Sequence, residues 1–164
     1  MRTLYLLRHA KSSWKDDSLR DFDRPLKRRG QEAAEQIGQV LADEKTASLL
    51  VISSPAARAR ETTKLVLESA GLRLEPRFDE RIYEADVRTL LEVVSSIPDK
   101  SQTAMLVGHN PGFENLLSYL TGDDRHMPTA ALARIEFEAS SWSEVSEGSG
   151  RLASFVTPKE LGDD

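Results

Sequence analysis

The sequence predicts an α/β protein: a three-layer α/β/α sandwich around a mostly parallel, mixed central sheet. Two observations carry this prediction. Short aliphatic segments alternate with amphipathic helical segments as far as Leu120, which is typical of parallel strands joined by crossover helices. After Pro128 the pattern changes to two alternating strand segments, 131–139 and 151–157, around a loop rich in serine and glycine. These last strands are expected to extend the same sheet.

The first elements follow from local composition. The strand at 3–7 is an aliphatic run, and a polar stretch at 11–24 separates it from a helix at 27–43. That helix carries alanine, isoleucine, valine and leucine at helical spacing. A short apolar strand follows at 48–53.

The middle of the chain continues the alternation, and glycines mark helix ends. Gly71 and Gly122 each follow a helical pattern, and glycine readily adopts the left-handed conformation that ends a helix. The predicted elements, in order, are a helix at 55–70, a strand at 72–78, a helix at 87–96, a strand at 103–107 and a helix at 111–120.

Length and composition restrict the class of protein. A chain of 164 residues with no internal repeat or linker fits one domain spanning residues 1–164, with a polar tail from about residue 158. The absence of cysteine excludes a disulfide framework, a thiolate zinc site and a cysteine nucleophile. The opening apolar stretch is too short for a signal peptide, so we expect a cytoplasmic protein.

The net charge argues against two kinds of partner. A value of −5 is unsuited to wholesale nucleic-acid binding, which relies on a basic face. No apolar run is long enough to span a membrane. We therefore expect neither nucleic acid nor membrane as a partner, and any anion site must be local.

Arginines and histidines follow the predicted strands. Ligands of such sheets bind outside the carboxyl ends of the strands. Arg8 and His9 follow the strand at 3–7, and His109 follows the strand at 103–107. Side chains alternate faces along a strand, so Arg8 and His9 can share a pocket only if the strand ends at Leu7. We expect it to end there.

Two predicted helix N-termini lie beside these residues. Ser54 as N-cap and Pro55 at the first helical position place Arg58 in the opening turn. A helix N-terminus offers free N–H groups and the positive end of the dipole, which suit a phosphate. Asn110 is expected to cap the other helix and to contact the substrate, with His109 at the helix mouth.

The residues next to Arg58 have other expected roles. Arg60 lies about 200° further round the helix and should be a solvated charge. Glu61, three residues after Arg58, is positioned to pair with it. The two arginines and two histidines at the strand ends are then expected to converge on one anion. Arginine binds phosphoryl oxygens in a bidentate manner, and a histidine held in one tautomer can attack phosphorus in line.

Four motifs between Leu4 and Leu120 carry a family resemblance: LLRHAKSSW, DFDRPLKRRG, SSPAARARETT and VGHNPG. Together and in this order they resemble the histidine phosphatase superfamily, specifically its SixA-like phosphohistidine phosphatase branch. The resemblance implies a phosphoglycerate mutase-like fold and no cofactor. It also implies that His9 is the nucleophile that becomes phosphorylated, and that Arg8, Arg58 and His109 form the phosphate pocket.

The resemblance extends to two further residues and has two departures. Ser12 matches a pocket serine, and Glu80, in DERIYEA, matches the segment that supplies a general acid in the mutase branch. The other interpretation of Glu80 is a loop carboxylate paired with Arg81 or a neighbour. The superfamily has glycine where this chain has Ala10, and an asparagine is replaced by Lys15. His126 matches no motif and is interpreted as a loop histidine.

Other chemistries fit the sequence less well. The DFD at 21–23 resembles the aspartate pair of haloacid dehalogenase phosphatases, but that pair needs an aliphatic strand directly before it, and DDSLR precedes it here. A metal bound by His9, His109 and a carboxylate would be repelled by the flanking arginines, so the reaction is expected to be metal-independent. No G-x-x-x-x-G-K-[ST] loop is present.

Three functions share such a pocket: hydrolysis, transfer by a mutase, and phosphate binding without catalysis. A binding module needs the arginines but no nucleophile. Mutase-type relatives insert segments over the pocket, whereas the short connections of this chain predict an open pocket that favours hydrolysis. An open pocket also admits phosphohistidine on a folded partner of the histidine phosphotransfer type, although a small phosphorylated substrate stays an alternative. The imidazole leaving group, with a pKa of about 6.5, is readily protonated.

Overall fold

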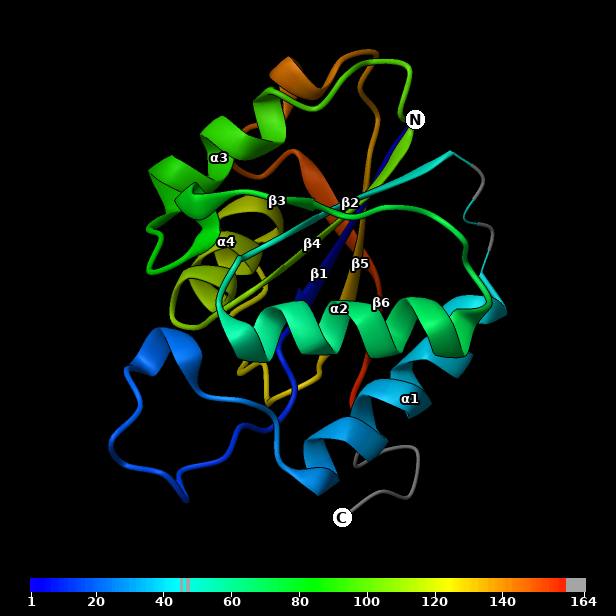
Figure 1. The fold of residues 1–164 in the computed structure, drawn as a ribbon. Coiled ribbons are helices and arrows are strands. Elements are labelled where there is room, and N and C mark those ends of the chain that lie inside the picture. The colour runs from blue at the N-terminus through cyan, green and yellow to red at the C-terminus, as the bar shows by residue number, and fades with distance from the viewer. Residues whose placement is uncertain (45, 47, 159–164) are drawn as a thin grey trace.

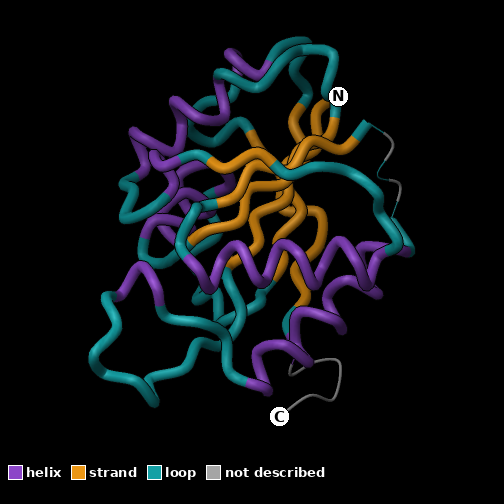
Figure 2. Tube along the Cα trace, viewed as in Figure 1, coloured by secondary structure: helices purple, strands orange, loops and turns teal. Residues whose placement is uncertain are grey.

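The computed structural model describes residues 1–44, 46 and 48–158, and within them six strands form one mixed sheet (Figures 1 and 2). The expected polar tail falls mostly on residues 159–164, which lie outside the described residues. The order across the sheet is β3-β2-β4-β1-β5-β6. The strands are β1 (Arg2–Arg8), β2 (Leu49–Ser53), β3 (Arg77–Phe78), β4 (Thr103–Gly108), β5 (Leu132–Phe137) and β6 (Gly150–Val156).

Strand direction divides the sheet into two parts. The first four strands are parallel, while β5 runs antiparallel to β1 and β6 antiparallel to β5. The two final strands therefore extend the same sheet as expected, and the predicted mixed α/β architecture is confirmed.

In the described part of the chain, four α-helices cover the two faces of the sheet (Figure 1). They are α1 (Arg28–Ala42), α2 (Ala57–Ala70), α3 (Val87–Ser95) and α4 (Gly112–Thr121). Alternate residues of β1 point to opposite faces: Tyr5 and Leu7 pack in the core with α1 and α2, whereas Leu4 and Leu6 pack with α3 and α4. None of the described helices has the length and apolarity that a bilayer crossing requires.

Parallel pairing brings three strand ends to one edge of the sheet. Arg8 is the register partner of Gly108, and Ser53 is the partner of Val107. Residues that follow β1, β2 and β4 are therefore neighbours, although about 50 positions separate one strand from the next along the chain.

Several predicted boundaries are wrong. β1 does not end at Leu7 but includes Arg8, because pairing with β4 continues as far as Gly108. Arg8 and His9 nevertheless line one cleft, because the strand ends between them and His9 is free of the alternation of faces. The strand predicted at 72–78 is reduced to Arg77–Phe78, the edge strand, because Pro76 has no N–H to donate to a ladder. Gly71 ends α2 in the left-handed conformation, with φ of 72°, as predicted.

Both helices beside the strand ends begin later than predicted. The N-cap of α2 is Ala56 rather than Ser54, and that of α4 is Pro111 rather than Asn110. Ser54 Oγ still accepts a hydrogen bond from Ala56 N (3.2 Å), although the helix starts after it, whereas Asn110 directs its side-chain amide to Glu114 and to the Met127 carbonyl. Arg58 nevertheless lies in the first turn of α2.

The polar stretch after β1 forms an ordered arm, which we call the 11–27 loop. Its two ends pair with each other, because Ser13 N donates to the Pro25 carbonyl (2.8 Å) and Lys27 N donates to the Lys11 carbonyl (3.0 Å). Gly30 of α1 packs against this base, where an added Cβ would lie 2.1 Å from the Lys11 carbonyl oxygen. Only glycine allows this close approach. The short helix η1 (Asp21–Asp23) lies within the loop.

Candidate active site

A cleft of about 370 Å³ opens where β1, β2 and β4 end. Basic and aromatic side chains dominate its walls. The lining residues are Arg8, His9, Lys11, Ser12, Trp14, Arg24, Lys27, Arg58, His109, Asn110 and Thr129. The structure therefore brings together six of the seven predicted site residues, Glu80 being the exception.

His9 is held in a defined orientation at the floor of the cleft. It follows β1 directly, is 7% exposed, and its Nδ1 lies 2.7 Å from the carbonyl oxygen of Ala10. A carbonyl oxygen can only accept, so Nδ1 carries the hydrogen and Nε2 keeps a free lone pair. This is the tautomer that a nucleophilic histidine requires.

The surroundings of His9 keep it neutral. Burial is the main cause and lowers the pKa of His9 to about 4, with further lowering by the nearby Arg58, Arg8 and Arg24, against which the hydrogen bond to Ala10 acts. An imidazole with this pKa has its lone pair available throughout the neutral pH range.

His109 lies against His9 and offers a second ring nitrogen to the cleft. The two ring centroids are 5.1 Å apart, and Nε2 of His109 lies 2.7 Å from Ser54 Oγ. Ser54 Oγ accepts a hydrogen bond from Ala56 N (3.2 Å), and within the described chain its hydroxyl proton has no other recorded acceptor than His109. The hydroxyl therefore donates to Nε2, which leaves Nδ1–H of His109 buried and without a partner among the described residues.

His109 is also neutral. Burial lowers its pKa to about 3, and the neighbouring His9 and Arg58 contribute to the shift. A buried N–H without an acceptor is costly, typically by about 1–3 kcal/mol, and an oxygen of a bound oxyanion would satisfy it.

Arg8 and Arg58 both present unsatisfied donors. Arg8 donates from Nη1 to the Met127 carbonyl (3.0 Å), while its Nε is buried without a partner among the described residues. The Arg58 side chain is 8% exposed, and its Nε is likewise unpartnered in this part of the chain. Glu61 does not pair with Arg58 as predicted. It accepts hydrogen bonds from Leu26 N (3.0 Å) and Gln31 Nε2 (2.9 Å) instead.

Asp21 holds Arg58 in place, a role that the sequence analysis missed. Arg58 Nη1 donates to the Asp21 carbonyl (2.8 Å) and Nη2 to Asp21 Oδ2 (3.0 Å), which also accepts from the Tyr83 hydroxyl (2.7 Å). Arg24 pairs with Oδ1 at 3.2 Å. Burial opposes ionisation of Asp21, but the hydrogen bonds from Tyr83 and Arg58 outweigh it and lower the pKa to about 2. Asp21 thus stays charged beside two arginines.

Tyr83 is the third residue of the group formed with Arg58 and Asp21. Burial, together with the hydrogen bond to the Asp21 carboxylate, raises the pKa of Tyr83 to about 12. Its ring packs edge-on against Phe22 and His109, at centroid distances of 5.2 and 5.5 Å. Asp21 lies in the DFD segment and Tyr83 in the DERIYEA segment, both of which stand out in the sequence. Neither segment shows by itself that it faces Arg58.

The remaining predicted site residues have varied positions. Ser12 lines the cleft and accepts from Arg24 Nη1 (2.9 Å). Asn110 Nδ2 donates to Glu114 Oε2 and to the Met127 carbonyl, both at 2.9 Å. Glu80 is the exposed first residue of η2 (Glu80–Ile82) and does not line the cleft. Arg81 pairs with Asp79 (2.7 Å) rather than with Glu80.

Other sequence expectations concern residues that do not line the cleft. Lys15 and Arg60 are exposed, as expected for Arg60. His126 is an exposed loop histidine that contacts the Glu114 carboxylate through Nδ1. The described residues contain no cluster of three or more histidine, aspartate or glutamate side chains suited to a metal ion, and metal independence stays a prediction.

The fold and the cleft define a class: a phosphoglycerate mutase-like α/β protein in which two arginines and two neutral histidines meet where the parallel strands end. The family model of the histidine phosphatase superfamily (branch 1) matches residues 4–100. The chain belongs to this superfamily, which confirms the family predicted from its motifs.

Similar proteins support the same grouping. An uncharacterised chloroplastic protein of Arabidopsis thaliana is 37% identical, covering 96% of this chain and 78% of the relative. The structure of a provisionally assigned phosphohistidine phosphatase SixA from Agrobacterium tumefaciens is 32% identical, covers 96% of this chain and 98% of that one, and has a TM-score of 0.79. A protein with the same provisional assignment from Nakamurella multipartitia is 27% identical, covers 96% of both chains, and has a TM-score of 0.84.

The depressed histidine pKa values predict a loss of stability in acid. An unfolded histidine binds a proton near pH 6.5, whereas folded His9 and His109 resist protonation until about pH 4 and about pH 3. Their contribution is therefore complete above pH 6.5 and is lost as the pH falls below it, by about 1.4 kcal/mol per pH unit for each residue. The free energy of unfolding, measured with urea from pH 7 to 4.5 in phosphate-free buffer, should fall less steeply with decreasing pH for His109→Gln than for the wild type. Identical slopes would contradict the assignment.

The hydrogen bonds between Arg58 and Asp21 can be tested with a matched pair of variants. Asp21→Asn removes the negative charge that holds Arg58, so kcat/KM for a small phosphate ester should fall by about ten- to a hundredfold, in keeping with a hydrogen bond to a charged group. Asp23→Asn, in the same motif, disturbs only the surface pair with Arg20 (3.0 Å) and should stay within twofold. Steady-state kinetics on both folded variants would test this, and equal kinetics would show that Arg58 does not depend on Asp21.

Proposed function

We propose that this protein is a metal-independent phosphatase that hydrolyses protein phosphohistidine through a phosphohistidine intermediate on His9. The observation that carries the proposal is the hydrogen bond from His9 Nδ1–H to the Ala10 carbonyl (2.7 Å), which leaves Nε2 free in a cleft lined by arginines. Membership of the histidine phosphatase superfamily, and structural neighbours provisionally assigned as phosphohistidine phosphatases, support the same choice.

The reaction has two steps. The Nε2 lone pair of neutral His9 attacks phosphorus, the bond between phosphorus and the substrate nitrogen breaks, and the leaving imidazole takes up a proton from solvent. Water then attacks the phosphohistidine and loses a proton to solvent, the bond between phosphorus and Nε2 breaks, and inorganic phosphate and neutral His9 are released. Arg8, Arg58 and the Nδ1–H of His109 bind the phosphoryl oxygens, on which negative charge must be stabilised in both transition states. Ser12 and Asn110 are proposed to contact the substrate.

The substrate class follows from the leaving group and the shape of the site. Imidazole, with a pKa of about 6.5, leaves readily once protonated, so little acid catalysis is needed. The cleft-lining residues include no acid of the kind that an alkyl phosphate would require, since Glu80 lies outside the lining. The partner is accordingly proposed to be a phosphorylated protein of the histidine phosphotransfer type, acting in the cytoplasm.

Rapid trapping tests the intermediate. After brief reaction with ³²P-labelled phosphohistidine protein in the presence of a chelator, the label should be on His9 as an acid-labile, base-stable adduct. His9→Ala should neither trap label nor turn over, because no other described histidine in the cleft has a free acceptor nitrogen. The exposed Arg60→Ala serves as a control that should retain both properties. Normal turnover by His9→Ala would exclude the mechanism.

The role of Glu80 stays a prediction, which a comparison of substrates would test. If Glu80 supplies the proton for a poor leaving group, Glu80→Gln should slow hydrolysis of a phosphomonoester at least tenfold more than that of phosphohistidine, within the range of general acid catalysis. The rates on p-nitrophenyl phosphate, a sugar phosphate and a phosphohistidine protein should be measured side by side. Unchanged rates on all three would leave Glu80 as a surface carboxylate.

A further inference from the structure

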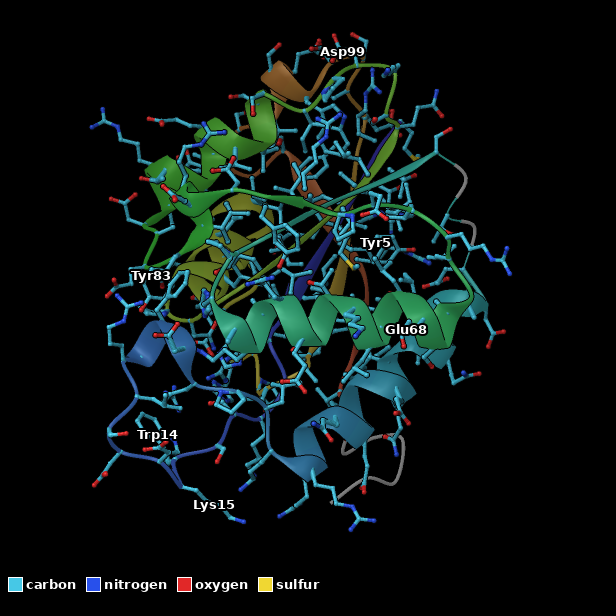
Figure 3. The ribbon with its side chains drawn as sticks, in the orientation of Figure 1. Tyr5, Trp14, Lys15, Glu68, Tyr83 and Asp99 are labelled. Carbon is cyan, nitrogen blue, oxygen red and sulfur yellow. The ribbon has the colours of Figure 1, made fainter. Side chains whose placement is uncertain are left out.

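The 11–27 loop carries exposed side chains beyond the catalytic pocket. Its base is closed by the backbone pairing of Ser13 with Pro25 and of Lys27 with Lys11. Trp14 and Lys15 lie at its outer end, away from the sheet and the helices (Figure 3). Trp14 nevertheless lines the cleft, so the loop connects the catalytic pocket with the outer surface.

Trp14 is fixed by one neighbour and open on its other side. It is 74% exposed, and the guanidinium carbon of Arg24 lies 3.4 Å from the centroid of its ring. Arg24 is itself buried and bound to Ser12 and Asp21, so this stacking contact rests on a rigid support. A large apolar side chain held at the mouth of a cleft is typical of an anchor residue at a protein interface.

The cleft holds more positive charge than one phosphoryl group needs. Arg8 and Arg58 suffice for the phosphoryl oxygens, yet Lys11 and Lys27 also line the cleft. Both lysines are exposed, and neither takes part in an ion pair within the described part of the chain. None of the lining residues is an aspartate or glutamate. Because Lys11 and Lys27 are exposed whereas His9 and Arg58 are buried, the surplus charge lies on the solvent side of the cleft.

We propose that Trp14, Lys11, Lys15 and Lys27 form a docking surface for an acidic protein segment that carries the phosphohistidine. This inference rests on the proposed function and names the partner surface that the site recognises. The chain has a net charge of −5, whereas the charged side chains that line the cleft are all basic, so an acidic segment is attracted to the cleft rather than to the molecule as a whole. Such an arrangement orients the encounter so that the phosphohistidine meets His9.

The outer position of Trp14 and Lys15 favours a protein over a small polyanion. A small phosphorylated molecule held at His9 and Arg58 would contact only the inner part of the cleft. Only a ligand that continues out of the cleft also reaches the exposed end of the loop, where Trp14 offers apolar area and Lys15 a further charge.

Two peptides of equal length test the proposal, and each carries one phosphohistidine. Aspartate and glutamate flank the phosphohistidine in the acidic peptide, and lysine flanks it in the basic peptide. Binding is measured on His9→Ala by tryptophan fluorescence, because the chain has two tryptophans and Trp142 is fully buried, so that Trp14 reports contact. The acidic peptide should bind at least tenfold more tightly at low salt, and the difference should shrink at high salt. Turnover of free phosphohistidine by the wild type is measured in parallel and reports the proposed function separately.

Charge reversal provides the matched variants. Lys27→Glu should reduce the preference for the acidic peptide to less than threefold, and Trp14→Ala should raise KM for both peptides more than for free phosphohistidine. Lys100→Glu is the control, because Lys100 is exposed and precedes β4, at the opposite edge of the sheet from the cleft. Equal affinity for the two peptides, or tighter binding of tripolyphosphate than of the acidic peptide, would overturn the docking surface. Loss of phosphohistidine turnover alone would overturn the proposed function instead.

Discussion

The in-register parallel pairing of β1 with β4 is the constraint on which the candidate site depends. Arg8 is the partner of Gly108, so the next residues along the two strands, His9 and His109, are brought together across 100 positions of sequence. Their rings lie 5.1 Å apart because the two strands end level with each other. A shift of two residues in this register would keep every core side chain on its proper face and still separate the two histidines.

Burial then determines the chemistry of these residues. The pocket withdraws two imidazoles from water, and the free energy of charging them rises, so both remain neutral beside Arg8 and Arg58. The same burial leaves donor groups of both arginines and of His109 without acceptors among the described residues. Stability is reduced by these unsatisfied donors, and an oxyanion that enters the cleft would satisfy them together.

Arg58 is held rigidly by an acidic partner and still keeps a donor group for a ligand. Asp21 takes two of its terminal N–H groups through a carbonyl and a carboxylate, while Tyr83 and Arg24 keep that carboxylate ionised. Asp21 binds Nη1 and Nη2, while Nε of Arg58 has no partner among the described residues and Arg58 lines the cleft. The Arg58 side chain is 8% exposed whereas that of Asp21 is 50% exposed, so loss of Asp21 would leave a buried guanidinium without its carboxylate partner.

The sequence by itself determined the alternation of strands and helices, the edge of the sheet at which the cleft opens, and the identity of His9, Arg8, Arg58 and His109 as neighbours. These follow from local periodicity and from the rule that parallel strands end at a common edge. Only the tertiary structure decided that Asp21 and Tyr83 hold Arg58, that Glu61 does not, and that Glu80 lies outside the cleft. A carboxylate takes its role from the group it faces, and the path of the 11–27 loop that brings Asp21 to Arg58 is set by contacts between residues distant in sequence. Ser54 and Asn110 illustrate the same limit, since each has the side chain of a cap but also contacts a residue distant in sequence, His109 and Met127 respectively.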